Sequence, residues 1–210
     1  MLLQQYIMTS FSDLKITRQY QNALEELGFE KPTPIQIKAI PAIRSGQHVI
    51  GIAQTGTGKT AAYLLPIFHK IGYAKGTAAR CIIIVPSKEL VVQLVEQVTE
   101  LTPYTDIRYV GIYGGVGRKA QAKAIHEGTD IIISTPRRLL ELYEKEHIQL
   151  NKVETMVLDE ADRMMDMGFR GQINAILEVV PTKKQNLLFS ATFSARVEEL
   201  SWNFMDFPVK

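Results

Sequence analysis

Three carboxylates stand close together after an apolar run, in the segment TMVLDEADRM at residues 155–164. Asp159, Glu160 and Asp162 have no basic neighbour before Arg163. Like charges crowded in this way are tolerated when a bound cation faces them. The chemistry that the spacing permits is a divalent metal ion held by carboxylate oxygen, with a second carboxylate to orient or deprotonate water. The alternative is that the acids open a helix and interact favourably with its dipole.

A glycine-rich loop supplies the positive group that these carboxylates require. Residues 53–60 read AQTGTGKT and lie between a strand-like run and a helical run. Gly56 and Gly58 permit close approach of the backbone, and successive N–H groups at a helix start bind phosphate. This is the P-loop pattern with alanine in place of its first glycine, in which Lys59 reaches the β- and γ-phosphates and the Thr60 hydroxyl coordinates Mg²⁺. An ordinary glycine-rich turn before a helix is the alternative.

Together the two segments predict a nucleoside triphosphatase site. A carboxylate at the end of a neighbouring strand holds the metal ion opposite a P-loop, which assigns Asp159 and Thr60 to Mg²⁺. Glu160, the next residue, would orient or deprotonate the attacking water. The catalytic set is therefore Lys59, Thr60, Asp159 and Glu160, and the central expectation is that Lys59 and Asp159 face one triphosphate from two sides.

Alternating strand-like and helix-like segments must position these groups. Apolar, β-branched runs occur at residues 48–53, 81–86, 107–113, 130–135, 154–159 and 186–191, with helical patterns between them. Such runs predict a doubly wound α/β fold, a parallel sheet with helices on both faces. Ligands of these sheets bind beyond the carboxyl ends of the strands, where Asp159 and Glu160 stand.

Length and composition fit one globular domain. The chain has 210 residues, of which 46% are hydrophobic and 22% are charged. A net charge of +2 means that nucleic acid, if bound, is held by placed groups and not by a generally basic surface. The single cysteine, Cys81, lies in an apolar run and is expected in the core, which fits a reducing compartment such as the cytoplasm. We expect residues 1–10 to be a flexible leader without signal-peptide features and residues 11–210 to form the domain.

The two nucleotide segments resemble the motifs of DEAD-box ATP-dependent RNA helicases, and the resemblance extends from Phe11 to Thr192. It implies the first of the family's two RecA-like domains, with ATP and Mg²⁺ as cofactors. The implied partners are RNA, bound through its backbone, and the second RecA-like domain of a longer parent protein. The resemblance further implies a monomer, with no membrane association.

The segment GFEKPTPIQ at residues 28–36 resembles the family's adenine-reading motif. In the family the matching glutamine, Gln36, hydrogen-bonds the adenine edge, while Phe29 stacks on the base and Lys31 lies near it. TPIQ is also a capping box with Thr33 as N-cap, and the two roles are compatible. Phe11 is expected in the core more than against the base. The implied nucleotide-binding set is Phe29, Lys31, Gln36, Ala53, Gln54, Thr55, Gly56, Thr57, Gly58, Lys59 and Thr60.

Three further segments stand where the family contacts RNA: PSKEL at residues 86–90, GG at 114–115 and TPRR at 135–138. Taken alone, each is an ordinary strand-to-helix turn. Helix starts and free N–H groups there bind phosphates without reading bases, which predicts sequence-independent, salt-sensitive binding. The sequence departs from the family at two positions: Lys88 stands where the family has arginine, and Arg137 stands where it has glycine. The implied RNA-binding set is Pro86, Ser87, Lys88, Gly114, Gly115, Thr135, Pro136, Arg137 and Arg138.

The segment LLFSATF at residues 187–193 resembles the family's Ser-Ala-Thr motif, which couples hydrolysis to strand separation. The implied coupling set is Asp162, Ser190, Ala191 and Thr192. Ser190 and Thr192 are expected to hydrogen-bond Asp162 or Glu160 if their strands are neighbours. Elsewhere, the histidines at positions 48, 69, 126 and 147 are interpreted as structural or exposed, and Trp202 and Phe204 as packing residues.

No segment resembles the His-Arg-x-Gly-Arg motif of the family's second domain, which supplies arginine fingers. An arginine supplied in trans is worth about 10³ to 10⁵ in rate in related systems. We therefore expect the chain alone to bind ATP or ADP with magnesium weakly, to hydrolyse ATP slowly and not to unwind duplexes. Two other functions stay open: another P-loop machine, such as a DNA helicase or GTPase, and a non-catalytic RNA-binding scaffold lobe.

Overall fold

The computed structural model describes residues 10–210, so the predicted leader lies almost entirely outside the described residues. Within this range, strands form a single parallel sheet in the order β1-β6-β5-β2-β4-β3. All of the predicted strands are present, at β1 (Val49–Ile52), β2 (Cys81–Ile84), β3 (Tyr109–Ile112), β4 (Ile131–Ser134), β5 (Thr155–Leu158) and β6 (Gln185–Ser190). The parallel pairing of every neighbour confirms the predicted α/β class.

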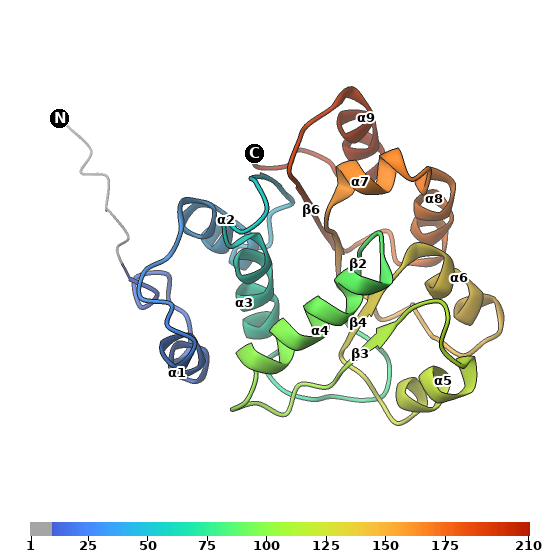
Figure 1. Cartoon of the computed structure of the whole chain (residues 1–210), viewed down its shortest axis with the longest axis horizontal. Helices are drawn as coiled ribbons and strands as arrows, with labels where there is room; N and C mark the ends of the chain where they lie inside the picture. The colour runs from blue at the N-terminus through green and yellow to red at the C-terminus, as the bar shows by residue number, and fades with distance from the viewer. Residues whose placement is uncertain (1–9) are drawn as a thin grey trace.

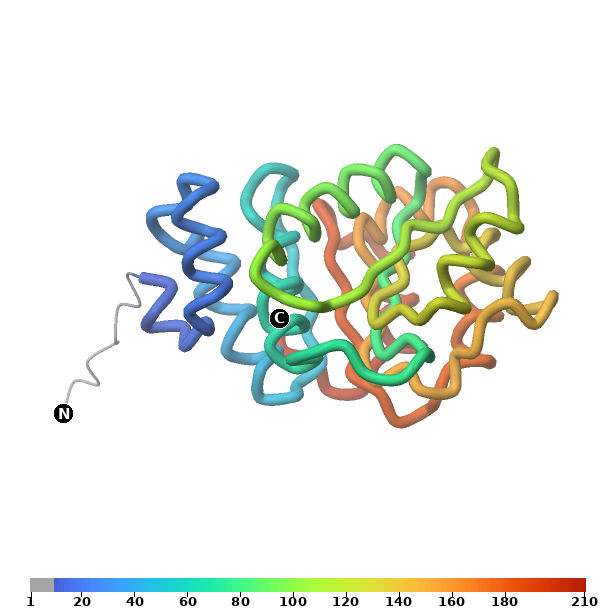
Figure 2. Tube along the Cα trace, turned by 90° about the horizontal axis from the view of Figure 1, so that it is seen from below, coloured from blue at the N-terminus to red at the C-terminus, as the bar shows by residue number. Residues whose placement is uncertain are grey.

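Helices cover both faces of the sheet (Figure 1). One apolar layer joins the sheet to α1 (Arg18–Glu26), α2 (Pro34–Arg44), α3 (Lys59–Ile71) and α4 (Lys88–Leu101). The other layer joins it to α5 (Arg118–His126), α6 (Pro136–Glu144), α7 (Ala161–Asp166), α8 (Arg170–Val179) and α9 (Ala195–Phe204). Figure 2 shows α1 and α2 at one end of the molecule and α5 at the other.

Strand residues alternate between the two layers. Ile83 and Val157 pack with α1–α4, whereas Ile82 and Met156 pack with α5–α9. Both faces are covered, so the central strands are apolar at every position, which is why the sequence shows continuous runs and not alternation. Cys81 belongs to the first layer, and burial raises the pKa of its thiol to about 12, as its predicted core role requires.

The parallel arrangement brings all strand ends to one edge of the sheet. Register pairs Ile52 with Ser190 and Ile84 with Leu158, so β1 and β6 end together and β2 and β5 end together. Leu158 pairs with Leu188, so the first pair of strands ends two residues further along than the second. Gly51 is required in β1 because a Cβ there would lie 2.4 Å from the Phe189 ring on β6. The edge therefore gathers loops from distant parts of the sequence.

The predictions for three aromatic residues have two outcomes. Phe204 is buried in the second layer, as predicted, and so is Phe11 in the first. Trp202 is 71% exposed, so its interpretation as a packing residue was wrong. The buried stripe of α9 consists of Val197, Leu200, Ser201 and Phe204, which leaves Trp202 on the solvent side.

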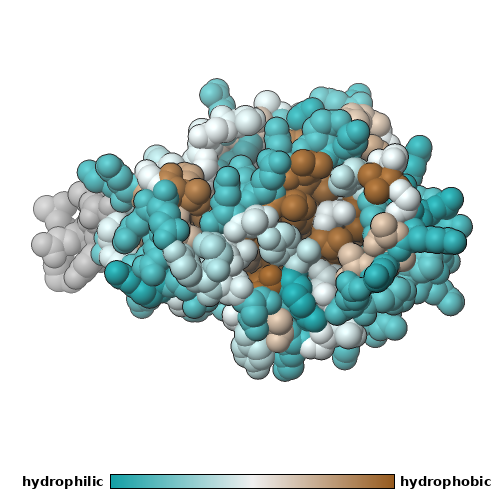
Figure 3. All heavy atoms as spheres, turned by 60° about the horizontal axis from the view of Figure 1, so that its bottom comes forward, coloured by the Kyte–Doolittle hydropathy of each residue, from teal (hydrophilic) through white to brown (hydrophobic). Residues whose placement is uncertain are grey.

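The surface is mainly hydrophilic on the face shown in Figure 3, where apolar side chains form small separate patches. Within residues 10–210, none of the helices has the length and apolar character needed to cross a membrane.

Candidate functional site

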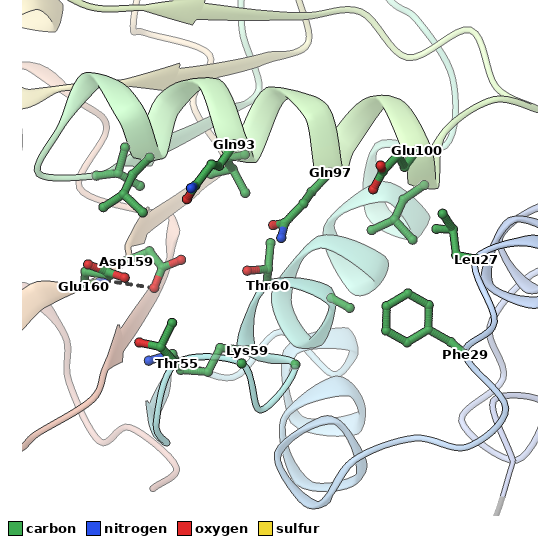
Figure 4. A pocket seen from close by; sticks show the side chains of 17 residues that line it. Leu27, Phe29, Thr55, Lys59, Thr60, Gln93, Gln97, Glu100, Asp159 and Glu160 are labelled. Atoms are coloured by element: carbon green, nitrogen blue, oxygen red, sulfur yellow. Dashed lines mark hydrogen bonds between the residues drawn. The ribbon is translucent and has the colours of Figure 1, made fainter.

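A cavity of about 380 Å³ lies at the carboxyl edge of the sheet, between the loop after β1, the turn after β5 and helix α4 (Figure 4). Both predicted nucleotide segments reach it. Its polar lining includes Thr55, Gly56, Gly58, Lys59, Thr60, Asp159 and Glu160. Residues that are about 100 positions apart in the sequence thus share one chamber, on the edge where α/β sheets bind ligands.

Backbone conformation shapes the glycine-rich loop. Gly56 and Gly58 have φ values of +84° and +89°, a backbone conformation that residues with a Cβ rarely adopt. Gly58 is the N-cap of α3, so the first turn of that helix begins inside the loop. The first N–H groups of a helix lack partners within the helix, so this turn has the arrangement on which the sequence-based prediction of phosphate binding rests.

Lys59 is buried, and its Nζ donates a hydrogen bond to the backbone carbonyl of Ala53 at 2.6 Å. The Lys59 ammonium therefore contacts the first residue of its own loop. Burial raises the pKa of Asp159, and the nearby charge of Lys59 opposes that rise. Lys59 and Asp159 line the same cavity, so the predicted placement of these two side chains around one chamber agrees with the geometry.

Asp159 directly follows β5 and is 8% exposed. Its Oδ2 accepts a hydrogen bond from the Tyr63 hydroxyl at 2.8 Å, and its Oδ1 accepts one from the N–H of Glu160 at 2.9 Å. Burial raises the pKa of Asp159, and this effect exceeds the opposing effects of the Tyr63 hydrogen bond and the Lys59 charge. Burial also raises the pKa of Tyr63 well above its ordinary value, with the neighbouring Asp159 adding to the rise.

Glu160 is held in an unusual backbone conformation. Its φ of 56° and ψ of 48° are left-handed, although it is not a glycine. It is the N-cap of α7, and its carboxylate pairs with Arg163 on the next turn. Strain of this kind costs on the order of 1–3 kcal/mol and is concentrated at functional sites.

Asp162 joins the acidic turn to the Ser-Ala-Thr segment. Its Oδ2 accepts hydrogen bonds from the backbone N–H and the hydroxyl of Thr192, both at 2.9 Å, and its own N–H donates to the Ser190 hydroxyl at 3.1 Å. Burial would raise the pKa of Asp162, but the hydrogen bonds from Thr192 and Ser190 hold it below its usual value. The predicted hydrogen bonding is present because β5 and β6 are neighbours. Ala191 connects the two hydroxyl residues.

Gln36 is fully buried beneath the phosphate loop and does not line the cavity. Its Oε1 accepts from the N–H of Thr33 at 2.9 Å, the glutamine half of the predicted capping box. Its Nε2 donates to the carbonyl of Gly58 at 3.1 Å. Gln36 thus connects the start of α2 to the start of α3.

Phe29, 43% exposed, lines the end of the cavity away from Asp159, together with Leu27 (Figure 4). Of the remaining predicted nucleotide-binding residues, Lys31, Gln54 and Thr57 lie outside the cavity lining, and Ala53 contributes its carbonyl to Lys59. Lys31 and Gln54 are exposed, and Thr57 bonds within the loop to the carbonyl of Gln54.

Sequence reasoning missed part of this cavity. Gln93, Gln97 and Glu100 project into it from α4, at spacings of four and three residues that place them on one helix face (Figure 4). Tyr63 was also missed. Its position four residues after Lys59 was the available signal, because a buried tyrosine hydroxyl usually has a hydrogen-bond partner.

The donors at the inner end of the cavity fit magnesium. Thr60 offers a hydroxyl and Asp159 a carboxylate, the oxygen ligands that Mg²⁺ prefers. Among the residues that the structure describes, no group of three or more His, Cys, Asp or Glu side chains forms a metal-binding cluster. Mg²⁺ at phosphate sites needs only one or two protein ligands besides phosphate oxygens and water, so the residues present are sufficient.

A second cavity of about 550 Å³ opens on the same edge of the sheet. Most of the predicted RNA-binding residues line it, and Gly115 and Pro136 are not among its lining residues. The lining residues are Pro86, Ser87, Lys88, Gly114, Thr135, Arg137, Arg138, Glu141, Met167 and Phe169. Glu141, Met167 and Phe169 were not predicted.

The two adjacent arginines of this second cavity differ. Arg137 is exposed, whereas Arg138 is buried and donates to the carbonyl of Val116 at 3.1 Å and to Gln121 Oε1 at 3.0 Å. Its Nε also lies 3.0 Å from the carboxylate of Glu141. The guanidinium of Arg138 is therefore bound by groups of the protein itself. The exposed cations of this lining are Lys88 and Arg137.

Comparisons with known proteins agree with the geometry. The DEAD/DEAH box helicase family model matches residues 33–200. The DEAD-box ATP-dependent RNA helicase CshA of Geobacillus kaustophilus is 39% identical over 201 residues, which are 96% of this chain and 43% of the relative. The ATP-dependent RNA helicase CshA of Listeria monocytogenes is 40% identical over 201 residues, 96% of this chain and 38% of the relative.

A solved structure shares the fold. The crystal structure of a DEAD box protein from the hyperthermophile Methanococcus jannaschii has a TM-score of 0.89 and 32% identity, and the match covers 96% of this chain and 55% of that one. The chain spans less than half of the length of the two curated relatives. The family match, the identity of these relatives and the fold together show that the chain belongs to the DEAD/DEAH box helicase family.

Proposed function

We propose that this chain is the ATP-binding domain of an ATP-dependent RNA helicase and that the whole protein couples ATP hydrolysis to local unwinding of RNA duplexes. One observation carries the proposal: the phosphate loop with Lys59 and Thr60 faces Asp159 and Glu160 across a single cavity. The names of the two curated relatives, both ATP-dependent RNA helicases, support it.

The phosphate end of the cavity performs the chemistry in this proposal. Lys59 exchanges the Ala53 carbonyl for oxygens of the β- and γ-phosphates, a change of partner that leaves its charge paired with a stronger acceptor. Glu160 orients the attacking water and accepts its proton. Thr60 and Asp159 would hold Mg²⁺, which would neutralise charge on the transferring phosphoryl group.

The other end of the same cavity holds the base. Phe29 offers an aromatic face for stacking, and Lys31, exposed on the same segment, lies near the base. Gln36 gives adenine selectivity if nucleotide binding releases its Nε2 from the Gly58 carbonyl. The backbone of residues 53–60 surrounds the phosphates.

RNA binds along the second cavity through its sugar-phosphate backbone. The carboxyl-edge loops that hold Pro86, Ser87, Gly114, Gly115, Thr135 and Pro136 supply helix starts and free N–H groups, and Lys88 and Arg137 supply exposed charge. Arg138 supports the shape of this lining from inside. Asp162, Ser190, Ala191 and Thr192 couple the state of the nucleotide to the bound strand, which the Asp162–Thr192 hydrogen bonds support.

In this proposal a second RecA-like domain completes the active site and supplies an arginine that stabilises the transition state. The 210-residue chain alone then binds Mg·ATP or Mg·ADP weakly and hydrolyses ATP very slowly. We place the whole protein in the cytoplasm, which the buried, unpaired Cys81 supports. We also propose that it is a monomer.

RNA-stimulated ATP hydrolysis tests the proposal. Turnover should be negligible for residues 1–210 and substantial for the whole protein, and ATP should compete for the site while GTP does not. Preference for GTP would favour a GTPase. If Lys59→Ala in the whole protein left its cellular activity intact, a non-catalytic scaffold would be the better function.

A further inference from the structure

We propose that Tyr63 is a positioning residue for Asp159, whose carboxylate it fixes in the orientation that receives the magnesium of a bound nucleotide. The inference rests on the proposed nucleotide site and adds a residue to it. Tyr63 does not line the cavity itself, so it acts through Asp159.

The contact is direct and buried. Tyr63 is completely buried, and its hydroxyl donates to Asp159 Oδ2 at 2.8 Å. The other carboxylate oxygen accepts the N–H of Glu160. Within residues 10–210, no other side chain donates a hydrogen bond to this carboxylate. Each oxygen has a further lone pair, so the two donors select which edge of the carboxylate stays free for the cavity.

The position of Tyr63 connects the two nucleotide segments. It follows Lys59 by four residues on α3, one helical turn further on the same face. The helix that begins in the phosphate loop is therefore bonded directly to the residue after β5. A shift of α3 relative to β5 would have to break this bond or carry Asp159 with it, so the bond restrains the position of Asp159 relative to the helix that holds Lys59.

The ring of Tyr63 packs against Phe189, and this contact orients the hydroxyl. Its centroid lies 5.0 Å from that of Phe189 on β6, with the planes inclined by 49°. Phe189 in turn fits over Gly51, where a Cβ would collide with it. Phe189 immediately precedes Ser190, whose hydroxyl accepts the N–H of Asp162. Tyr63 thus stands where α3, β5 and β6 meet.

A purely structural tyrosine would satisfy its buried hydroxyl and do no more. Its loss would lower stability without changing how strongly magnesium improves nucleotide binding. A positioning tyrosine makes a different prediction, because residues that orient a metal ligand typically change metal affinity by about 10- to 100-fold when they are removed.

The test is Tyr63→Phe, which keeps the ring and removes the hydroxyl. The affinity for ADP is measured by titration calorimetry, once with Mg²⁺ and once with EDTA. We expect the enhancement by magnesium to fall about tenfold while the affinity in EDTA stays within about twofold. Tyr20→Phe is the matched control, because Tyr20 is also buried and its hydroxyl makes no hydrogen bond with either nucleotide segment. Its enhancement should equal that of the wild type.

A double-mutant cycle separates positioning from a general loss of stability. In the Asp159→Asn background, Tyr63→Phe should change the magnesium enhancement no further, because the oriented carboxylate is already gone. An unchanged enhancement in Tyr63→Phe, with a wild type that depends on magnesium, would overturn the positioning role alone. A wild type that binds ADP equally with and without magnesium would overturn the proposed function and this role together.

Discussion

Thr192 places two donors, its backbone N–H and its hydroxyl, on the same oxygen of Asp162, each at 2.9 Å. The acidic turn after β5 and the Ser-Ala-Thr segment after β6 are thereby bonded through charge-assisted contacts, which are stronger than neutral ones. Movement of one segment must therefore either carry the other with it or break these bonds.

This bond predicts the effect of Thr192→Val in the whole protein. The substitution keeps the shape and the backbone N–H but removes one donor. We expect ATP hydrolysis to fall less than about threefold, because Lys59 and Asp159 are untouched, while duplex unwinding per ATP hydrolysed falls about tenfold. Ser194→Ala is the control, since it weakens only the cap of α9, where Ser194 Oγ accepts the N–H of Val197 at 3.4 Å. Equal loss of hydrolysis and unwinding in Thr192→Val would contradict a coupling role.

Two glycines of the phosphate loop predict a difference in stability. Gly56 and Gly58 both have positive φ, but only Gly58 has neighbours, since a Cβ there would lie 2.5 Å from Gln36 Nε2. Substitution by alanine at either position brings the left-handed strain of about 1–2 kcal/mol. We expect Gly58→Ala to lower the free energy of unfolding by about 1–3 kcal/mol more than Gly56→Ala, because it also displaces a buried side chain. Urea denaturation measures the difference, and equal losses would show that Gln36 gives way freely.

Asp130 predicts a defined pH dependence of stability. Its buried carboxylate contacts Arg80 at 2.7 Å and Arg108 at 3.1 Å. Burial would raise its pKa, but hydrogen bonds from Arg108 and Arg80 hold the pKa below the ordinary value. A carboxyl with a lowered pKa in the folded state stabilises the protein fully above its unfolded pKa, and the contribution disappears as pH falls through the folded pKa.

Asp130→Asn should therefore lower the free energy of unfolding by about 2–3 kcal/mol at pH 7. The gap from the wild type should narrow as the pH falls below about 4, the ordinary value for aspartate. Urea denaturation from pH 7 to pH 3 checks both statements. A gap that stays constant over this range would mean that the two arginines do not stabilise the carboxylate.

Neighbouring arginines at the second cavity should behave differently on substitution. Arg137 is exposed and Arg138 is buried among internal acceptors. Arg137→Ala and Lys88→Ala should each reduce the slope of log affinity against log salt by about 0.7 for single-stranded RNA, at unchanged stability. Arg138→Ala should instead lower the melting temperature. Lys152→Ala, an exposed lysine before β5, is the control for charge alone. Loss of salt dependence in Lys152→Ala would contradict a localised RNA path.

The fold and the meeting of the two nucleotide segments were predictable because they depend on local pattern. Continuous apolar runs identify buried strands, and parallel strands bring their ends to one edge, so Asp159 and the phosphate loop had to converge. Tyr63 was not predictable in the same way. Its partner is 96 positions away, and the contact depends on how α3 lies over β5. Gln93 and Gln97 were missed because a polar helix face reads as solvent-exposed unless a cavity is known to adjoin it.

Gln36 shows how one motif can carry two kinds of contact. Its spacing from Thr33 predicted the capping bond, which depends only on residues three apart. Its bond to Gly58 depends on how α2 packs against α3, and local spacing contains no information on that packing. The prediction that Trp202 packs in the core was wrong for a related reason. The buried stripe of α9 could be placed only once the neighbours of this helix were known.

Calorimetric titration of the 210-residue chain with ADP and magnesium, for the wild type and for Lys59→Ala, tests the central claim most directly. The wild type should bind one nucleotide at sub-millimolar concentration, and Lys59→Ala should bind at least about tenfold more weakly, because it removes a charge-assisted contact to phosphate. A flat titration of the wild type at millimolar ADP, or equal affinities of the two proteins, would contradict a nucleotide-phosphate site between Lys59 and Asp159.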